Sequence, residues 1–194
     1  MREKIHLEGK LITLEEIEPK FFPYVVEWRN DPTLNQFIDQ TFVLTLEKQY
    51  DWYENQYLKN DPGRYQGCLI GVDKSTGEPF GMTGWTAFDL EKRRLVRNRL
   101  LTSRKAGSPM HIFEMLFLSS EYLYQFVDVM YSQVVEGNSR AQRLGKITGF
   151  VINEGETQYP QWSTLRGMRT IERYRTKEQF QVARDKFYQL LEDE

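Results

Sequence analysis

The spacing of apolar and polar positions along the first third of the chain predicts one strand and two helices. Residues 5–14 read as a first strand that is interrupted at Gly9. Residues 19–28 have helical spacing, and Asn-Asp-Pro at 30–32 ends that helix, because the residue before a proline disfavours the helical conformation. A second helix is predicted from about 45 to 60, before the next Asp-Pro-Gly sequence.

The middle of the chain predicts a meander followed by a buried helix. Strands are expected at about 64–73, 79–89 and 94–103, separated by turn sequences such as Lys-Ser-Thr-Gly. From 110 to 127 apolar residues occur on nearly every side of a helix. Such a helix is buried on more than one side, typically against a sheet.

The last third of the chain continues the alternation of strands and helices. A strand is predicted at 130–136, a short amphipathic helix at 139–148, a strand at 150–154 and a last strand near 164–174. Thr-Lys-Glu-Gln then matches a capping box and begins a terminal helix over about 176–192. The order of elements predicts a mixed α/β fold in one domain that spans residues 1–194.

Composition narrows the functional classes. The chain has 194 residues, 40% of them hydrophobic and 28% charged, as in globular proteins. A net charge of −2 argues against a general nucleic-acid binder, although seven of the fourteen residues from Lys92 to Lys105 are basic. Cys68 is the only cysteine and two histidines are present, which excludes an internal disulfide and gives no zinc-binding spacing. With no signal-like N-terminus and no long apolar run, the sequence predicts a soluble cytoplasmic protein without a metal.

A basic loop that contains glycine separates the strand ending near 103 from the buried helix. It consists of Arg104, Lys105, Ala106, Gly107, Ser108, Pro109 and Met110. The first N–H groups of a helix are unpaired and lie at the positive end of its dipole, and proline suits the first helical position. The loop therefore predicts a phosphate-binding site, with an ordinary strand-to-helix connection as the alternative.

A second motif follows the next predicted strand. Asn138, Ala141 and Leu144 stand at intervals of three, and Gly-Phe follows at 149–150. This N-x-x-A-x-x-L-x-x-x-x-G-F pattern, about thirty residues after the basic loop, resembles the cofactor half of the GNAT acyltransferase superfamily. The resemblance implies a central, mostly antiparallel sheet flanked by helices, with the C-terminal helix as an addition. It also implies acetyl-CoA as a co-substrate.

The resemblance assigns roles to the cofactor residues. The loop from Arg104 to Met110 would hold the pyrophosphate of coenzyme A, and main-chain N–H groups around Leu101 and Thr102 would polarise the thioester carbonyl. Asn138 would contact the pantetheine arm, or simply cap its helix, and Ala141 would let that helix approach the cofactor. Many members have a tyrosine after the leucine of the motif, where it protonates the departing thiolate, whereas this chain has Gly145.

Acceptor residues are suggested by Trp-Arg-Asn-Asp-Pro at the end of the first helix. This segment resembles the branch that acetylates protein N-termini and nucleotide-linked amino sugars, so Trp28, Arg29 and Asn30, together with Arg97, are candidates for acceptor binding. A core tryptophan followed by a helix stop is the alternative. Glu136 is the candidate general base, with a solvated loop carboxylate as its alternative.

The sequence thus predicts an acyl-CoA-dependent N-acyltransferase that moves acetyl from acetyl-CoA to a primary amine. A nucleotide-linked amino sugar is the favoured acceptor and a protein N-terminus the second. Two other functions stay open, namely a GNAT-fold binding or structural protein without turnover and a nucleotide or nucleic-acid binding module. The sequence leaves the oligomeric state undetermined.

Overall fold

A computed structural model describes residues 3–60, 65–103 and 108–192. Its strands are β1 (His6–Glu8), β2 (Ile12–Glu16), β3 (Gly67–Asp73), β4 (Pro79–Asp89), β5 (Arg94–Thr102), β6 (Val129–Val135), β7 (Val151–Ile152), β8 (Thr164–Leu165) and β9 (Met168–Thr176). Its α-helices are α1 (Phe22–Asn30), α2 (Pro32–Asn35), α3 (Leu46–Trp52), α4 (Pro109–Leu123), α5 (Ser139–Ile147) and α6 (Lys177–Glu192). Short turns of other helix types are η1 (Pro19–Phe21), η2 (Tyr53–Tyr57) and η3 (Pro160–Trp162).

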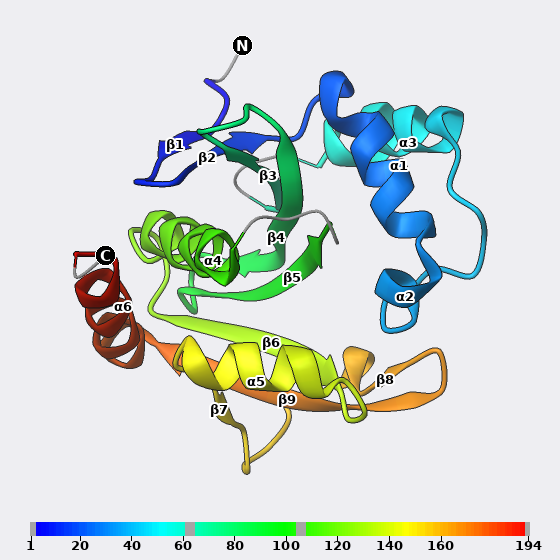
Figure 1. Cartoon of the computed structure of the whole chain (residues 1–194). Coiled ribbons are helices and arrows are strands. Elements are labelled where there is room, and N and C mark those ends of the chain that lie inside the picture. The colour runs from blue at the N-terminus through cyan, green and yellow to red at the C-terminus, as the bar shows by residue number, and fades with distance from the viewer. Residues whose placement is uncertain (1–2, 61–64, 104–107, 193–194) are drawn as a thin grey trace.

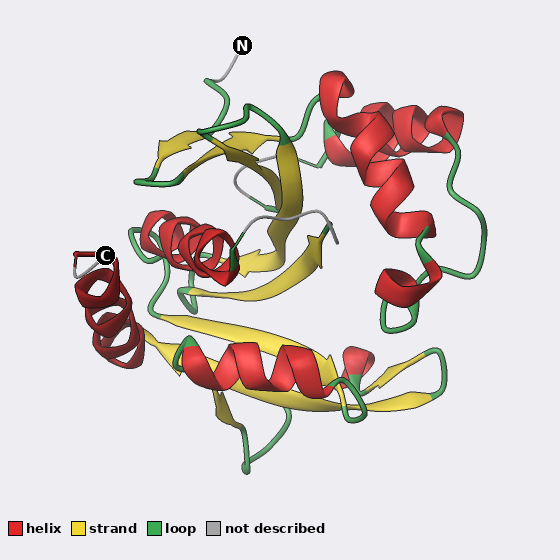
Figure 2. Ribbon diagram, viewed as in Figure 1, coloured by secondary structure: helices red, strands yellow, loops and turns green. Residues whose placement is uncertain are grey.

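The strands form one sheet in the order β1-β2-β3-β4-β5-β6-β9-β7, and β8 pairs with β9 (Figures 1 and 2). Among the described strands, β5 and β6 are the one parallel pair, and the other pairs are antiparallel. Within the described ranges no helix is both long and apolar enough to cross a membrane. The predicted mixed α/β fold with a mostly antiparallel sheet and an added C-terminal helix is confirmed.

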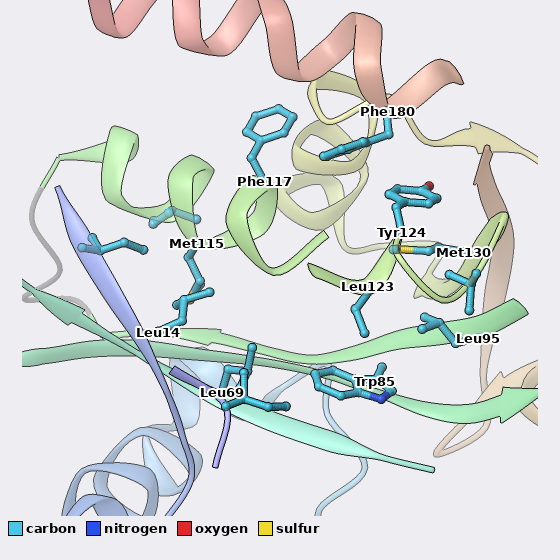
Figure 3. Packing of buried hydrophobic residues seen from close by; sticks show 14 of the residues in the cluster. Leu14, Leu69, Trp85, Leu95, Met115, Phe117, Leu123, Tyr124, Met130 and Phe180 are labelled. Atoms are coloured by element: carbon cyan, nitrogen blue, oxygen red, sulfur yellow. The ribbon is translucent and has the colours of Figure 1, made fainter. Parts of the chain in front are cut away.

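Helices cover both faces of the sheet. Successive residues of β3 point to opposite faces of the sheet and pack in two separate cores. Leu69 packs in the first core, with residues of α4 and α6, and Ile70 packs in the second core, with residues of α1 and η2. Figure 3 shows the first cluster, in which Phe117 of α4 and Phe180 of α6 come together above the sheet. Helix α5 lies on the α4 face, because Arg173 and Arg175, two positions apart on β9, reach α5 and α4 respectively.

The prediction of one interrupted strand at 5–14 is wrong, because the segment forms the two strands of a hairpin, β1 and β2. The β1–β2 turn is stabilised by a residue that lies about a hundred positions later in the sequence. The buried carboxylate of Glu114 on α4 accepts the backbone N–H groups of Lys10, Leu11 and Ile12 at 2.6, 2.8 and 3.2 Å. A Cβ atom at Gly9 would lie 2.8 Å from the Glu114 carboxylate carbon, so the close approach requires glycine.

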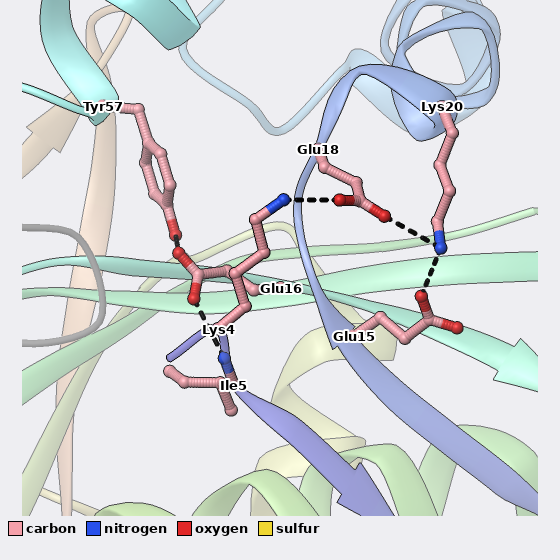
Figure 4. Close-up of polar contacts among 7 residues, drawn as sticks. All are labelled: Lys4, Ile5, Glu15, Glu16, Glu18, Lys20 and Tyr57. Carbon is pink, nitrogen blue, oxygen red and sulfur yellow. Dashed lines mark hydrogen bonds and ion pairs between the residues drawn. The ribbon is translucent and has the colours of Figure 1, made fainter. Parts of the chain in front are cut away.

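A second carboxylate anchors the opposite face of the same hairpin. Glu16, buried at the end of β2, accepts the Tyr57 hydroxyl at 3.0 Å and the backbone N–H of Ile5 at 3.1 Å (Figure 4). The Tyr57 oxygen in turn accepts the N–H of Cys68 at 3.3 Å. The aromatic end of η2 is thereby fixed against β3. Lys4, Glu18 and Lys20 form a more exposed chain of ion pairs beside it.

The predicted last strand near 164–174 is instead a hairpin of β8 and β9. Arg166 and Gly167 form its turn with φ values of 51° and 79°, and glycine is well suited to the second of these. The predicted capping box is confirmed at the start of α6: Thr176 N donates to Gln179 Oε1 at 2.8 Å, and Gln179 N donates to Thr176 Oγ1 at 3.3 Å.

The two central strands part after a short paired stretch. Residues Arg94–Arg97 of β5 pair with Val129–Ser132 of β6, and the remaining residues of each strand have no pairing with the other. On its other edge β5 carries a bulge, where the pairing with β4 shifts between Gly84 and Met82 and Arg99 adopts a φ of 57°. A bulge strengthens the local twist of a strand. The twist turns the end of β5 away from β6.

We expect Glu114→Ala to lower the free energy of unfolding by about 2–4 kcal/mol, because three N–H groups of the β1–β2 turn lose a charged acceptor. Urea denaturation followed by circular dichroism measures this loss. Glu121→Ala serves as the matched control on the same helix, since Glu121 makes a partly exposed pair with Arg184 and should change stability by less than about 1 kcal/mol. Equal losses in the two variants would contradict the assigned role of Glu114.

Candidate functional site

A cavity of about 550 Å³ lies where β5 and β6 part. It reaches both faces of the sheet, because Ser120 of α4 and Gly145 of α5 line it on one side, and Arg29 of α1 and Trp52 of α3 line it on the other. We call these sides the α4–α5 side and the α1–α3 side. A passage through a sheet at parted strands lets two ligands meet from opposite faces.

Of the predicted cofactor residues, Asn138 and Ala141 lie on the α4–α5 side of the cavity, whereas Leu101 lines the cavity and packs in the second core. Arg104, Lys105, Ala106 and Gly107 fall outside the described residues. Ser108 is exposed and immediately precedes α4, Pro109 is the first residue of that helix, and Met110 follows it and packs against the first core.

Asn138 and Ala141 both line the cavity from α5. Asn138 is also the cap of that helix, since its side-chain oxygen accepts the N–H of Ala141 at 3.0 Å. The capping role given as the alternative is therefore confirmed, and it places the helix start at the cavity. The cap uses the side-chain oxygen only, so the amide nitrogen of the same asparagine can still donate to a ligand.

The end of β5 presents its edge to the opening. Leu101 lines the cavity, and Thr102 is buried, with its hydroxyl accepting a bond of 3.1 Å from Arg140 of α5. Ser103 N donates to Phe80 on β4 at 2.7 Å. Because successive N–H groups of a strand point to opposite edges, the N–H of Thr102 points toward the β6 side, where β5 has no strand partner.

The four predicted acceptor residues lie in four different places. Arg29 lines the cavity on the α1–α3 side, where burial lowers the pKa of its guanidinium. Trp28 packs in the second core, as its alternative interpretation has it, and Asn30 binds both the N–H and the C=O of Leu44, which fixes the loop before α3. Arg97 points to the α4 face instead of the acceptor face.

Glu136, the candidate base, is not among the described residues that line the cavity. Its side chain is 51% exposed and pairs with Arg169 at 3.0 Å. This geometry matches the alternative of a solvated loop carboxylate. Asp39 is the single carboxylate in the described lining. Nowhere in the described ranges do three or more His, Cys, Asp or Glu side chains gather as metal ligands would.

Two arginines of β9 belong to the site, although the sequence motifs gave neither of them a role. Arg173 donates to the backbone oxygens of Gln142 and Ala141 at 2.9 and 3.1 Å. Arg175 is 1% exposed and donates to Thr148 O and Ser120 Oγ, both at 2.6 Å. Alternation along β9 was the available signal, since positions 173 and 175 share one face of a strand.

The lining is strongly positive. It contains Arg29, Arg97, Arg99, Arg173 and Arg175 against the one carboxylate. Burial lowers the pKa of Arg173 to about 10 and, with the nearby charge of Arg175, that of Arg97 to about 9. Both groups remain cationic at neutral pH, so the cavity favours anionic ligands.

Gly145 leaves room for the Arg173 guanidinium against α5. A Cβ atom at this position would lie 2.3 Å from Arg173 Nη1 and 2.5 Å from the guanidinium carbon. The guanidinium therefore fills the space over the helix at the position where the resemblance leads one to expect a tyrosine. Any larger side chain at 145 requires Arg173 to leave its place.

We compared the sequence and the structure with known proteins. No protein-family model and no curated protein matches the sequence. Solved structures match this chain over almost its full length. FdhC, described as a nucleotide-linked sugar GNAT, matches with a TM-score of 0.74 and 14% identity, over 96% of this chain and 98% of that one. A putative acetyltransferase from T. thermophilus matches with a TM-score of 0.76 and 19% identity, over 98% of this chain and 99% of that one. Spermidine N-acetyltransferase from Vibrio cholerae, solved with CoA and spermine, matches with a TM-score of 0.72 and 12% identity, over 89% of this chain and 99% of that one.

The chain has the GNAT fold. The suspected resemblance is confirmed at the level of architecture, and identities of 12–19% limit the comparison to the fold. The two sequence motifs fall between β5 and α4 and between β6 and α5 of this fold. Because FdhC matches over 96% of this chain, the likeness extends well beyond those motifs.

We expect Gly145→Ala to lower the free energy of unfolding by about 1–2 kcal/mol. The new methyl group displaces Arg173 from two backbone acceptors, which outweighs the roughly 1 kcal/mol that alanine gains over glycine inside a helix. Chemical denaturation measures the change.

The control for this prediction is the same substitution in an Arg173→Met background. Without the guanidinium, Gly145→Ala should be neutral or stabilising, because only the helix propensity remains. A destabilisation of the same size in both backgrounds would show that Arg173 is not the group that requires glycine.

Proposed function

We propose that this protein is an acyl-CoA-dependent N-acyltransferase that moves an acyl group, acetyl in the case the resemblance indicates, to a primary amine. The observation that carries the proposal is the passage through the sheet at the parted strands of a GNAT fold. A thioester can enter from the α4–α5 side and an amine from the α1–α3 side. Holding the two together supplies much of the rate of such a reaction.

The residues on the α4–α5 side suit coenzyme A. The start of α4 at Ser108 and Pro109 is exposed, and Asn138 and Ala141 line the cavity at the start of α5. Coenzyme A would supply the activated thioester carbonyl. The N–H of Thr102, at the edge of β5 that lacks a partner strand, would donate to that carbonyl oxygen as charge develops on it.

The amine must lose a proton in the reaction. A primary amine has a pKa near 10 in water, and the arginines of the lining favour its neutral form by repelling the ammonium ion. Glu136 is paired with Arg169 outside the described lining, so the geometry does not favour it as the base. We therefore propose that the neutral amine attacks directly and that water takes up the proton.

The charge of the lining favours an anionic acceptor. Among the five arginines, Arg29 and Arg99 lie on the α1–α3 side, and Arg99 stacks over Trp52 at 5.6 Å. A nucleotide-linked amino sugar carries a diphosphate for such groups and an amine for the thioester, and FdhC, a structural neighbour, is described as a nucleotide-linked sugar GNAT. A protein N-terminus ranks second. A polyamine such as the spermine bound to the Vibrio enzyme would be repelled.

A GNAT-fold protein without turnover is the second candidate. The space over Gly145 is filled by Arg173, and the described lining offers one carboxylate and no tyrosine or histidine for proton transfer. Such a protein would bind coenzyme A and release no free thiol in the presence of amines.

We expect acetyl-CoA at a hundredfold excess over Kd to stabilise the fold by about 2.7 kcal/mol, because a ligand that binds only the folded state shifts the unfolding equilibrium. Thermal-shift titration measures the effect. Ala141→Leu should weaken binding at least about tenfold, since it adds bulk to a residue that lines the cavity, whereas Arg143→Leu on the exposed side of α5 should not. No shift at millimolar acetyl-CoA would refute acetyl-CoA as the donor, and no shift with free CoA either would refute the CoA site.

We expect nucleotide-linked amino sugars to give a higher kcat/KM than peptides or spermidine in a free-thiol release assay, and the preference to weaken with added salt. Arg29→Gln should reduce turnover of the anionic acceptor, and Arg169→Gln should not, because Arg169 is 78% exposed and outside the described lining. Preference for the polyamine would contradict the assignment. Thiol release with none of the amines would favour the non-catalytic alternative.

A further inference from the structure

Arg97 stands at the apex of the opening between the central strands. It is the last residue of β5 that pairs with β6, opposite Ser132, and beyond it the strands diverge. Its side chain is buried on the α4–α5 side, where Nη2 donates to Thr83 Oγ1 at 2.8 Å and to Ser119 Oγ at 2.9 Å. Its other terminal nitrogen, Nη1, is buried and has no hydrogen-bond partner among the described residues.

Two more guanidinium groups share this side of the cavity. Arg173 has an unpartnered, buried Nε, and Arg175 is almost fully buried. In the described part of the chain, all three arginines bond only to neutral groups: hydroxyls, backbone oxygens and a thioether. Buried charges in proteins are normally paired, because an uncompensated charge is costly to remove from water. Three cations without a carboxylate therefore form a site for an anion.

The position of the site identifies the part of the ligand that reaches it. A linear thioester that enters between β5 and β6 from the ends of the strands places its tip, the acyl chain, at the apex beside Arg97. The acceptor approaches from the opposite face, so its own anionic groups meet Arg29 and Arg99 instead. The anion at the apex must consequently belong to the acyl donor.

We propose that the preferred donor is a CoA thioester whose acyl chain ends in a carboxylate, such as succinyl-CoA, and that Arg97 binds this carboxylate with Arg175 close by. The inference rests on the proposed function. In the reaction the amine nitrogen attacks the thioester carbon, the C–N bond forms and the C–S bond breaks. The thiolate leaves, the amine proton goes to water, and the distal carboxylate is unchanged.

The test compares succinyl-CoA with butyryl-CoA, which has the same four-carbon chain and a methyl group in place of the carboxylate. Calorimetric titration of the wild-type protein without acceptor should give a Kd for succinyl-CoA that is at least about tenfold lower, as expected for a charged hydrogen bond. This measurement needs no turnover and no variant. Equal affinities, or tighter binding of butyryl-CoA, overturn the inference while leaving the proposed function intact.

Two variants test whether Arg97 is the residue that causes the preference for succinyl-CoA. Arg97→Met should abolish the preference for succinyl-CoA and raise the melting temperature, because it removes a buried, uncompensated charge. Arg169→Met, at an exposed arginine outside the described lining, should keep the preference. A preference that survives in folded Arg97→Met places the carboxylate elsewhere and overturns the assignment to Arg97. If neither thioester binds the wild-type protein, the proposed function fails and this inference fails with it.

Discussion

The parting of β5 and β6 is the constraint on which the rest of the molecule depends. Their hydrogen bonding stops after Arg97 and Ser132, and the bulge at Arg99 turns the end of β5 away. An ordinary sheet would close this space with further backbone bonds. Here the strand edge lacks a partner strand, which supplies a cavity with lining residues from both faces of the sheet.

Arginine side chains connect the elements around the opening, where the strands do not pair. Arg175 joins β9 to α4 through Ser120 and to the end of α5 through Thr148. Arg173 holds the carbonyls of α5, and Gly145 gives it room. Because guanidinium groups offer several fixed donors, a few of them can brace two helices over an open sheet. The cationic lining and the stability of the opening thus arise from the same residues.

Local chemistry decided which parts of this structure could be predicted from the sequence. The caps at Thr176 and Asn138 and the apolar helix α4 were correct because they depend on neighbouring residues. The β1–β2 hairpin and the β8–β9 turn were missed. The first depends on Glu114, about a hundred residues away, and the second on two positive φ values that a short strand pattern conceals.

In the candidate site, too, the local features could be predicted and the long-range ones could not. The motif around Asn138 located α5 and one wall of the cavity, since that signal lies within one short helix and its ends. Alternation placed Arg173 and Arg175 on one face of a strand, but their roles and that of Arg97 depend on the tertiary fold. A strand with several arginines is usually a solvated edge, and only the tertiary fold buries these three.

Burial of these arginines at an open strand edge is itself an argument for function. Replacing buried charges by apolar groups commonly leaves stability unchanged or increases it, so the bracing contacts of Arg173 and Arg175 do not account for a third buried guanidinium, that of Arg97, beside neutral partners. Their common location on the α4–α5 side of the cavity accounts for them. A site that must bind an anion repeatedly keeps its cations desolvated and fixed in advance, and the cost in stability is the condition for binding there.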